Sequence, residues 1–184
     1  MQTLLFLDTE FTNLTQHSAL LSLALVSENG HQFYAEFTDY PKDEISDFVR
    51  DNVISKLFLD ESHHTYYEGK KVLLLGTKQS IKEGLGRWLL QFGEAEKAIQ
   101  IWGNCLQYDW VFFCELFGGS LQLPKQIHYM PMDISVLFQM KTGNPDTDME
   151  EFVDDEHVIK DRKLHNALYD AQLTKACYQK LIKM

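Results

Sequence analysis

The sequence predicts an α/β domain built on a mixed β-sheet that is flanked by helices. The first forty residues read as consecutive strands joined by a short turn, and the rest of the chain alternates strand-like runs with helix-like segments. Strands first, followed by alternating strands and helices, are typical of this architecture. A length of 184 residues fits one core, so we assign residues 1–184 to a single domain.

Three strands are expected to begin the sheet. Residues 4–8 (LLFLD) form a short apolar run that ends in an acid, as a buried strand does. Residues 20–27 and 31–37 flank Asn29-Gly30, and Asn-Gly between two strand-like runs is the strongest short hairpin signal. Because no clear helix separates the first strand from the second, we expect an antiparallel three-strand meander.

The elements that follow are expected to alternate. Apolar residues at helical spacing predict a helix over 43–59, and 61–71 reads as a polar connection. Residues 72–76 are either a short strand or the end of a loop. The remaining predictions are a helix capped by Ser80, a strand over 98–103, a helix over 108–117, a strand over 127–135 that is broken at Pro131, a helix from Asp133 to Met140, a loop or surface helix over 146–156 and a last helix over 166–183.

Charge and composition limit the classes of function. The chain has 27 acidic and 17 basic residues and a net charge of −10, which does not favour a nucleic-acid partner, because phosphate binding draws on Lys and Arg. The three cysteines form no CxxC pair and no zinc spacing. The N-terminal residues lack a signal-peptide pattern, and no apolar stretch approaches the roughly 20 residues of a membrane helix. We therefore expect a cytoplasmic protein.

Paired acids close the first predicted strand. Asp8 and Glu10 are two residues apart, so a strand places both carboxylates on the same face. Two carboxylates at the end of a buried run are costly unless a cation joins them, and hard divalent cations prefer carboxylate oxygens. Taken alone, Asp-x-Glu is common and fits an exposed strand end equally well.

Two later segments add to this pattern. Asp109 follows the 98–103 strand near the start of an aromatic-rich helix, and His165 precedes Asp170 by five residues at the start of the last helix. Each also has a purely structural interpretation, since an acid is favourable at a helix N-terminus and a lone histidine is more often structural than catalytic.

Together, these three segments resemble the motifs of the DEDD 3′–5′ exonucleases, in the expected order and over essentially the whole chain. Asn166 stands where the Tyr subtype has Tyr, so His165 indicates the DEDDh subtype. LLFLDTEFT and LLSLALVSENGHQFYAEF resemble the small stand-alone bacterial and phage 3′–5′ exoribonucleases of this superfamily. The resemblance implies an RNase H-like fold and release of nucleoside monophosphates from single-stranded RNA.

The resemblance also implies a metal-dependent mechanism. The family uses two divalent ions, Mg²⁺ or Mn²⁺, which clamp the attacking and leaving oxygens. Asp8 would bridge the ions, Glu10 and Asp170 would complete one site, and Asp109 would support the other. His165 would be the general base. Five residues along a helix correspond to a rotation of about 140°, so we expect His165 on the loop ahead of the helix.

Substrate contacts are implied for two further segments. In the family, the residues after the first acids grip the 3′-terminal nucleotide, which here are Phe11, Thr12 and Leu14, with Leu14 against the last base and Thr12 near the sugar hydroxyl. Core packing explains Phe11 and Leu14 equally well. Arg162 and Lys163 belong to a local basic patch just before His165, which also fits a solvated loop.

Three alternatives stay open at this point. A 3′–5′ DNA exonuclease of the proofreading or repair type would use the same catalytic residues. A catalytically silent nucleic-acid-binding protein is disfavoured by the complete set of four acids and His165. An RNase H-type endonuclease is disfavoured by the spacing of His165 and Asp170. Relatives are often homodimers, which implies the same for this chain by analogy alone.

Overall fold

The computed structural model describes residues 2–60, 64–93, 95–153 and 164–184. Within these ranges, one seven-stranded sheet has the order β4-β5-β3-β2-β1-β6-β7. The strands are β1 (Thr3–Phe11), β2 (Leu20–Ser27), β3 (Gln32–Phe37), β4 (Tyr66–Glu68), β5 (Lys71–Gly76), β6 (Ile99–Gly103) and β7 (Met132–Asp133).

The pairing of the strands confirms the predicted mixed sheet. β1, β2 and β3 form an antiparallel meander, and Gly30 makes the tight turn between β2 and β3 with a φ of +83°. β5 pairs with β3 in parallel, β6 with β1, and β7 with β6. The register of β1 against β2 shifts between Glu10 and Phe11, at the end of the strand that carries the paired acids. Such irregularities re-aim side chains next to active sites.

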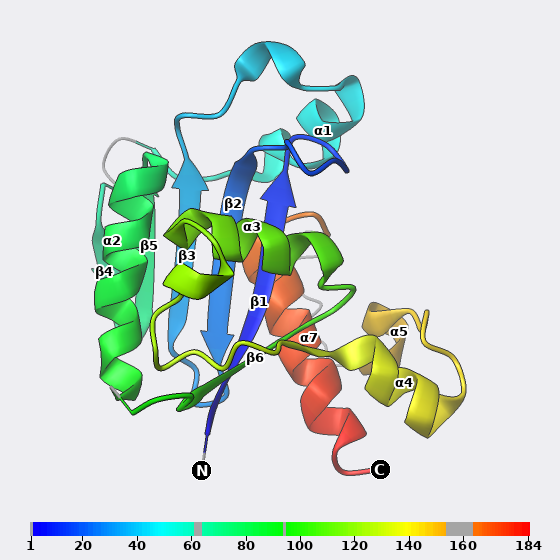
Figure 1. The fold of residues 1–184 in the computed structure, drawn as a ribbon. Helices are drawn as coiled ribbons and strands as arrows, with labels where there is room; N and C mark the ends of the chain where they lie inside the picture. The colour runs from blue at the N-terminus through cyan, green and yellow to red at the C-terminus, as the bar shows by residue number, and fades with distance from the viewer. Residues whose placement is uncertain (1, 61–63, 94, 154–163) are drawn as a thin grey trace.

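Helices cover both faces of the sheet, as Figure 1 shows: α2 and α3 lie on one face and α7 on the other. The helices are α1 (Asp47–Asn52), α2 (Lys78–Leu89), α3 (Gln107–Phe117), α4 (Ile134–Thr142), α5 (Met149–Val153) and α7 (Ala167–Leu181). Short 3-10 turns at Lys42–Glu44 and Ile54–Lys56 flank α1. The two layers explain why every residue of β2 is buried.

The alternation of side chains along β1 sorts residues between these two layers. Leu5 and Leu7 belong to the main core under α2 and α3. Phe6 lies between them and points to the α7 side, where its ring centroid is 5.3 Å from that of Tyr178. Asp8 and Glu10 continue this second row, so β1 directs its acids toward the start of α7.

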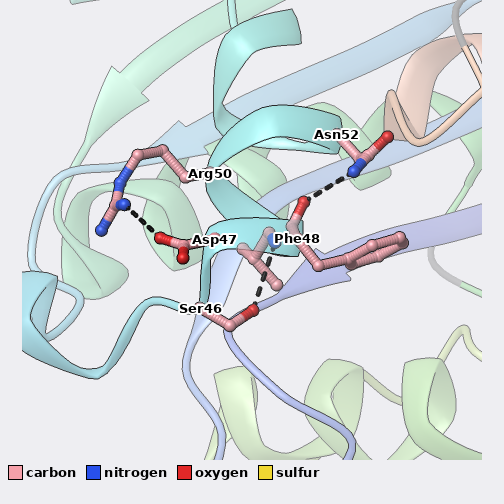
Figure 2. Close-up of polar contacts among 6 residues, drawn as sticks. Ser46, Asp47, Phe48, Arg50 and Asn52 are labelled. Atoms are coloured by element: carbon pink, nitrogen blue, oxygen red, sulfur yellow. Dashed lines mark hydrogen bonds and ion pairs between the residues drawn. The ribbon is translucent and has the colours of Figure 1, made fainter.

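The helix predicted over 43–59 is wrong in its extent. Ile45 and Ser46 are extended, with ψ values of 120° and 159°, and they interrupt the helix before α1 begins. The Ser46 hydroxyl accepts the Val49 N–H and caps α1, as Figure 2 shows. Apolar spacing predicted helical turns here but not the capping serine that divides them.

Two other predictions need correction, and a third is confirmed. Thr77, and not Ser80, caps α2, because its hydroxyl accepts the Ser80 N–H. The connection predicted over 61–71 contains β4, whose three residues are all exposed and therefore show no apolar alternation. The strand predicted over 127–135 is broken at Pro131, as expected: Ile127 makes an isolated bridge to Ile99 before the break, and Met132–Asp133 form β7 after it.

Other predicted elements are confirmed. Residues 72–76 form most of strand β5, Asp133 caps α4, and Asn166 caps α7. Among the residues that the structure describes, no helix combines the length and the apolar composition that crossing a bilayer requires.

Candidate active site

Three carboxylates from two distant parts of the chain meet at the end of β1. Asp8 and Glu10 lie on the strand, and Asp170 lies in the first turn of α7. Each offers a carboxylate oxygen, and these oxygens all lie within 4.8 Å of one another. We call Asp8, Glu10 and Asp170 the carboxylate cluster.

Asp109, the fourth predicted acid, is held beside this cluster by Thr9, which lies between Asp8 and Glu10 on β1. Thr9 points to the opposite face of β1 and donates both its backbone N–H and its hydroxyl to Asp109 Oδ1, at 2.8 and 2.7 Å. Asp109 lies in the first turn of α3 and is buried. Asp8, Asp109 and Asp170 line the same cleft, although Asp109 is not one of the three acids within 4.8 Å.

The start of α3 is fixed by a turn that the acid at the end of β7 supports. The Asp133 carboxylate accepts the N–H groups of Cys105 and Leu106 at 3.3 and 3.0 Å. Gly103 makes room for this turn, because a Cβ there would lie 2.3 Å from the Leu106 side chain. These contacts determine where Asp109 enters the site.

His165 lies on the loop just ahead of α7, as its spacing from Asp170 predicted. Its backbone N–H donates to Asp170 Oδ2 at 2.8 Å, and the edge of its ring meets the ring of Phe48 with centroids 5.9 Å apart. Its φ is +67°, a left-handed conformation that costs a residue with a side chain about 1–2 kcal/mol. The surrounding contacts therefore hold His165 in place against local strain.

Burial and mutual repulsion shift the acids toward their protonated forms. Burial, together with the charges of Asp170 and Asp109, raises the pKa of Glu10 to about 8, and the same causes raise the pKa of Asp8 well above its usual range. Burial raises the pKa of Asp170 to about 7, although the N–H of His165 opposes the shift. Burial also raises the pKa of Asp109 against the two hydrogen bonds from Thr9. Acids that repel one another in this way fit hard divalent cations, which take carboxylate oxygens.

Without metal, this arrangement should make the protein less stable as the pH rises. A carboxyl group whose pKa is higher in the folded state stabilises the fold fully below its unfolded pKa, and that contribution is lost as the pH rises through the folded pKa. For Glu10 and Asp170 the loss falls between about pH 4 and pH 8. Thermal melts in EDTA should therefore give a falling Tm across this range, and a flat or rising Tm would contradict it.

The predicted substrate residues lie in different surroundings. Leu14 lines the cleft, which has a volume of about 390 Å³, and its side chain is 68% exposed. Phe11 also lines the cleft, but its ring packs against Phe112, with centroids 4.9 Å apart. Thr12 is buried, and its hydroxyl accepts the Ala19 N–H at 3.0 Å. Arg162 and Lys163 lie outside the described residues.

Sequence reasoning missed Lys56, which follows α1. Its ammonium group donates to the carbonyl of Leu164, next to His165. The charge of Lys56 opposes the upward pKa shifts of Glu10 and Asp170, and together with burial, the larger cause, it lowers the pKa of His165. No motif marks Lys56, because only the tertiary fold brings it to the site.

Comparison with known proteins agrees with this geometry. Residues 3–182 match the 3′–5′ exoribonuclease Rv2179c-like domain. The chain belongs to this family. Among its relatives is the 3′–5′ exoribonuclease Rv2179c of Mycobacterium tuberculosis strain H37Rv, which is 26% identical over 167 residues, 91% of this chain and 86% of the relative. The 3′–5′ exoribonuclease MT2234.1 of strain CDC 1551 / Oshkosh matches to the same extent.

Solved nucleases share the fold at lower identity. Cell-death related nuclease 4 (CRN-4) superposes with a TM-score of 0.68 and 16% identity over the whole of this chain, which spans 64% of the length of CRN-4. The Mg²⁺- and Mn²⁺-bound form of S. pombe Pop2p gives a TM-score of 0.62 and 13% identity over 97% of this chain and 82% of Pop2p. The predictions of an RNase H-like fold and of membership in a 3′–5′ exoribonuclease family are confirmed.

Proposed function

We propose that this chain removes nucleoside monophosphates one at a time from the 3′ end of single-stranded RNA, with Asp8, Glu10, Asp109, Asp170 and His165 as its catalytic residues. The observation that carries the proposal is the convergence of three carboxylates within 4.8 Å, beside Asp109 and His165, in a chain of an exoribonuclease family. Membership supports the reaction class, and the geometry supports the roles of the residues.

The acids would hold two divalent ions, Mg²⁺ or Mn²⁺. Asp8 would bridge the ions, with Glu10 and Asp170 on one and Asp109 on the other. The raised pKa values of Glu10 and Asp170 support this assignment, because burial and mutual repulsion disfavour their charged forms and bound divalent ions would relieve the repulsion. When bound, such ions lower the pKa of an attacking water and neutralise charge on the leaving 3′ oxygen.

His165 would accept the proton of the attacking water. A general base must be unprotonated to act, and burial together with the charge of Lys56 lowers the pKa of His165 below its usual 6.5. The lowered pKa favours the neutral imidazole that a base needs, and His165 lines the cleft.

The terminal nucleotide would lie against Leu14. Tyr108 donates its hydroxyl to the Leu14 carbonyl at 3.2 Å, which fixes the backbone while the side chain stays exposed to the cleft. Because the net charge is −10, we propose short contacts near the 3′ end and low processivity. Several expectations stay predictions. They are the roles of Thr12, Arg162 and Lys163, the single domain over 1–184, the cytoplasmic location and a homodimer.

Labelled oligonucleotides test the substrate and the direction of attack. A 5′-labelled single-stranded RNA with Mg²⁺ or Mn²⁺ should yield a ladder that shortens from the 3′ end, and a 3′-phosphate should slow it, because the terminal hydroxyl would no longer be recognised. The matched control is single-stranded DNA of the same sequence, which we expect to be cleaved more slowly. Early release of the 5′ label as a mononucleotide would contradict the direction, and equal or faster cleavage of DNA would favour a DNA exonuclease.

A further inference from the structure

His165 needs external support, because the chain around it adopts a conformation that its own sequence does not favour. A φ of +67° is uncommon for a residue with a side chain, and such conformations persist where the surroundings determine them. The N–H of His165 is held by Asp170, which belongs to the proposed metal site itself. The contacts of its two neighbours, Leu164 and Asn166, therefore support the loop from outside the metal site.

Both neighbours of His165 are bound by the same residue. The ammonium group of Lys56 donates to the carbonyl of Leu164, on one side of His165. The carbonyl of Lys56 accepts a hydrogen bond from Asn166 Nδ2 at 3.2 Å, on the other side. Lys56 thus spans the histidine, because it binds the peptide group before His165 and the side chain of the residue after it.

The Asn166 side chain makes other hydrogen bonds besides the one that caps α7. Its Oδ1 accepts the Tyr169 N–H at 3.3 Å, which starts α7. Its Nδ2 donates to Tyr34 Oη, also at 3.3 Å, as well as to Lys56. The side chain is 3% exposed, so these donors have little access to water as an alternative partner.

The sheet anchors this arrangement through a buried carboxylate on β3. Glu36 is 2% exposed and accepts the Tyr34 hydroxyl at 2.8 Å. It also accepts the N–H of Phe58 at 2.8 Å and that of Leu59 at 3.2 Å, which fixes the chain just after Lys56. The ring of Phe58 stacks on Tyr34, with centroids 4.9 Å apart and planes at 5°. The contacts close a circuit from β3 through Lys56 and Asn166 and back to β3.

We infer that Lys56 and Asn166 are positioning residues that hold His165 at the angle the reaction needs. The inference deepens the function proposed above and rests on it. The sheet carries the acids on β1 and, through this circuit on β3, also sets the position of the base. A displacement of about 1 Å can cost 10²-fold in rate, so the circuit has a measurable effect on turnover.

Asn166→Ser gives the sharpest test, because serine caps a helix about as well as asparagine but lacks the Nδ2 donors. We expect kcat to fall about 10- to 100-fold, with KM for RNA and the rise in Tm on adding Mn²⁺ unchanged within error. The matched control is Asn144→Ser, which removes an Nδ2 donor to the Asp146 carbonyl in the exposed turn after α4 and should leave kcat unchanged.

A double-mutant cycle separates positioning from general damage to the fold. In a His165→Ala background, Asn166→Ser should change kcat less than about two-fold, since no base remains to be positioned. An equal loss in both backgrounds, or no loss in either, would overturn the inference. If His165→Ala alone left kcat near normal, the general base of the proposed function would fail instead, so the two failures are distinguishable.

Lys56→Met provides a second variant that does not touch α7. It keeps the aliphatic stem but removes the donor to Leu164, so it should lower kcat only when His165 is present. Lys56→Arg keeps a donor and should restore most of the rate. Lys70→Met is the control, because its ammonium group also donates to a backbone carbonyl, that of Asn29 at 2.9 Å, in the β2–β3 turn. A loss of kcat from Lys56→Met that persists in His165→Ala would overturn the role of Lys56.

Discussion

Asp8→Asn should abolish exonuclease activity while making the metal-free fold more stable. Asparagine keeps the shape of the side chain but removes the charge that Glu10 and Asp170 repel, and it can donate a hydrogen bond to either. We expect the rate on RNA to fall more than about 10³-fold, because the residue that would bridge both ions is lost. In EDTA, we expect Tm at pH 8 to rise, since the repulsion acts when the acids are ionised.

Two measurements check this prediction together. Rates are measured on labelled RNA in Mn²⁺, and thermal melts are recorded in EDTA and in Mn²⁺. In the wild type, Mn²⁺ should raise Tm and EDTA should abolish activity, whereas Asp8→Asn should show little response to Mn²⁺. Asp47→Asn is the control, because the Asp47 side chain is 91% exposed and pairs with Arg50 at the surface (Figure 2), so the variant should behave as the wild type. Retained activity in Asp8→Asn or in EDTA would exclude the proposed metal site.

His165→Ala should lower kcat by about 10²–10⁴-fold, the range over which general bases contribute. The acids stay in place, so the Mn²⁺-dependent rise in Tm and the KM for RNA should be kept. His64→Ala is the matched control and should retain full turnover, because His64 is exposed and lies near β4, at the edge of the sheet. Near-normal turnover in His165→Ala would make His165 a structural residue.

The pH dependence of the rate gives an independent check on His165. A base acts in its deprotonated form, so the wild-type rate should fall as the pH drops through the pKa of His165. Burial and the charge of Lys56 lower that pKa, which places the falling limb below about pH 6.5. In His165→Ala this limb should flatten or move, and an unchanged profile would mean that another group controls it.

The extent to which the sequence predicts the fold depends on what each segment buries. The meander was predictable because Asn29-Gly30 marks the turn and β2 is apolar throughout. β4 was not predictable, because its residues face solvent and its existence depends on pairing with β5. The helix over 43–59 failed for a local reason, since Ser46 competes with the helix by capping a new one.

The residues of the candidate site also differ in how far the sequence predicts them. Asp8, Glu10, Asp109, His165 and Asp170 were predictable because their three segments together resemble the motifs of a known exonuclease family, and each segment lies within one strand or at the start of one helix. Lys56 was not, because it reaches the site through a turn that Glu36 anchors from a distant strand. Asn166 was predicted as a helix start, and the structure adds its contacts to Tyr34 and Lys56.

The carboxylate cluster joins segments of the chain that are translated at different times. The ribosome makes Asp8 and Glu10 before His165 and Asp170, which follow the seven strands that the structure describes (Figure 1). With the assignment proposed above, a nascent chain that has formed its sheet still lacks the third member of the carboxylate cluster and the base. Because the two parts of the cluster meet only once the domain has folded as a unit, we expect a chain that has not yet made α7 to be inactive on RNA.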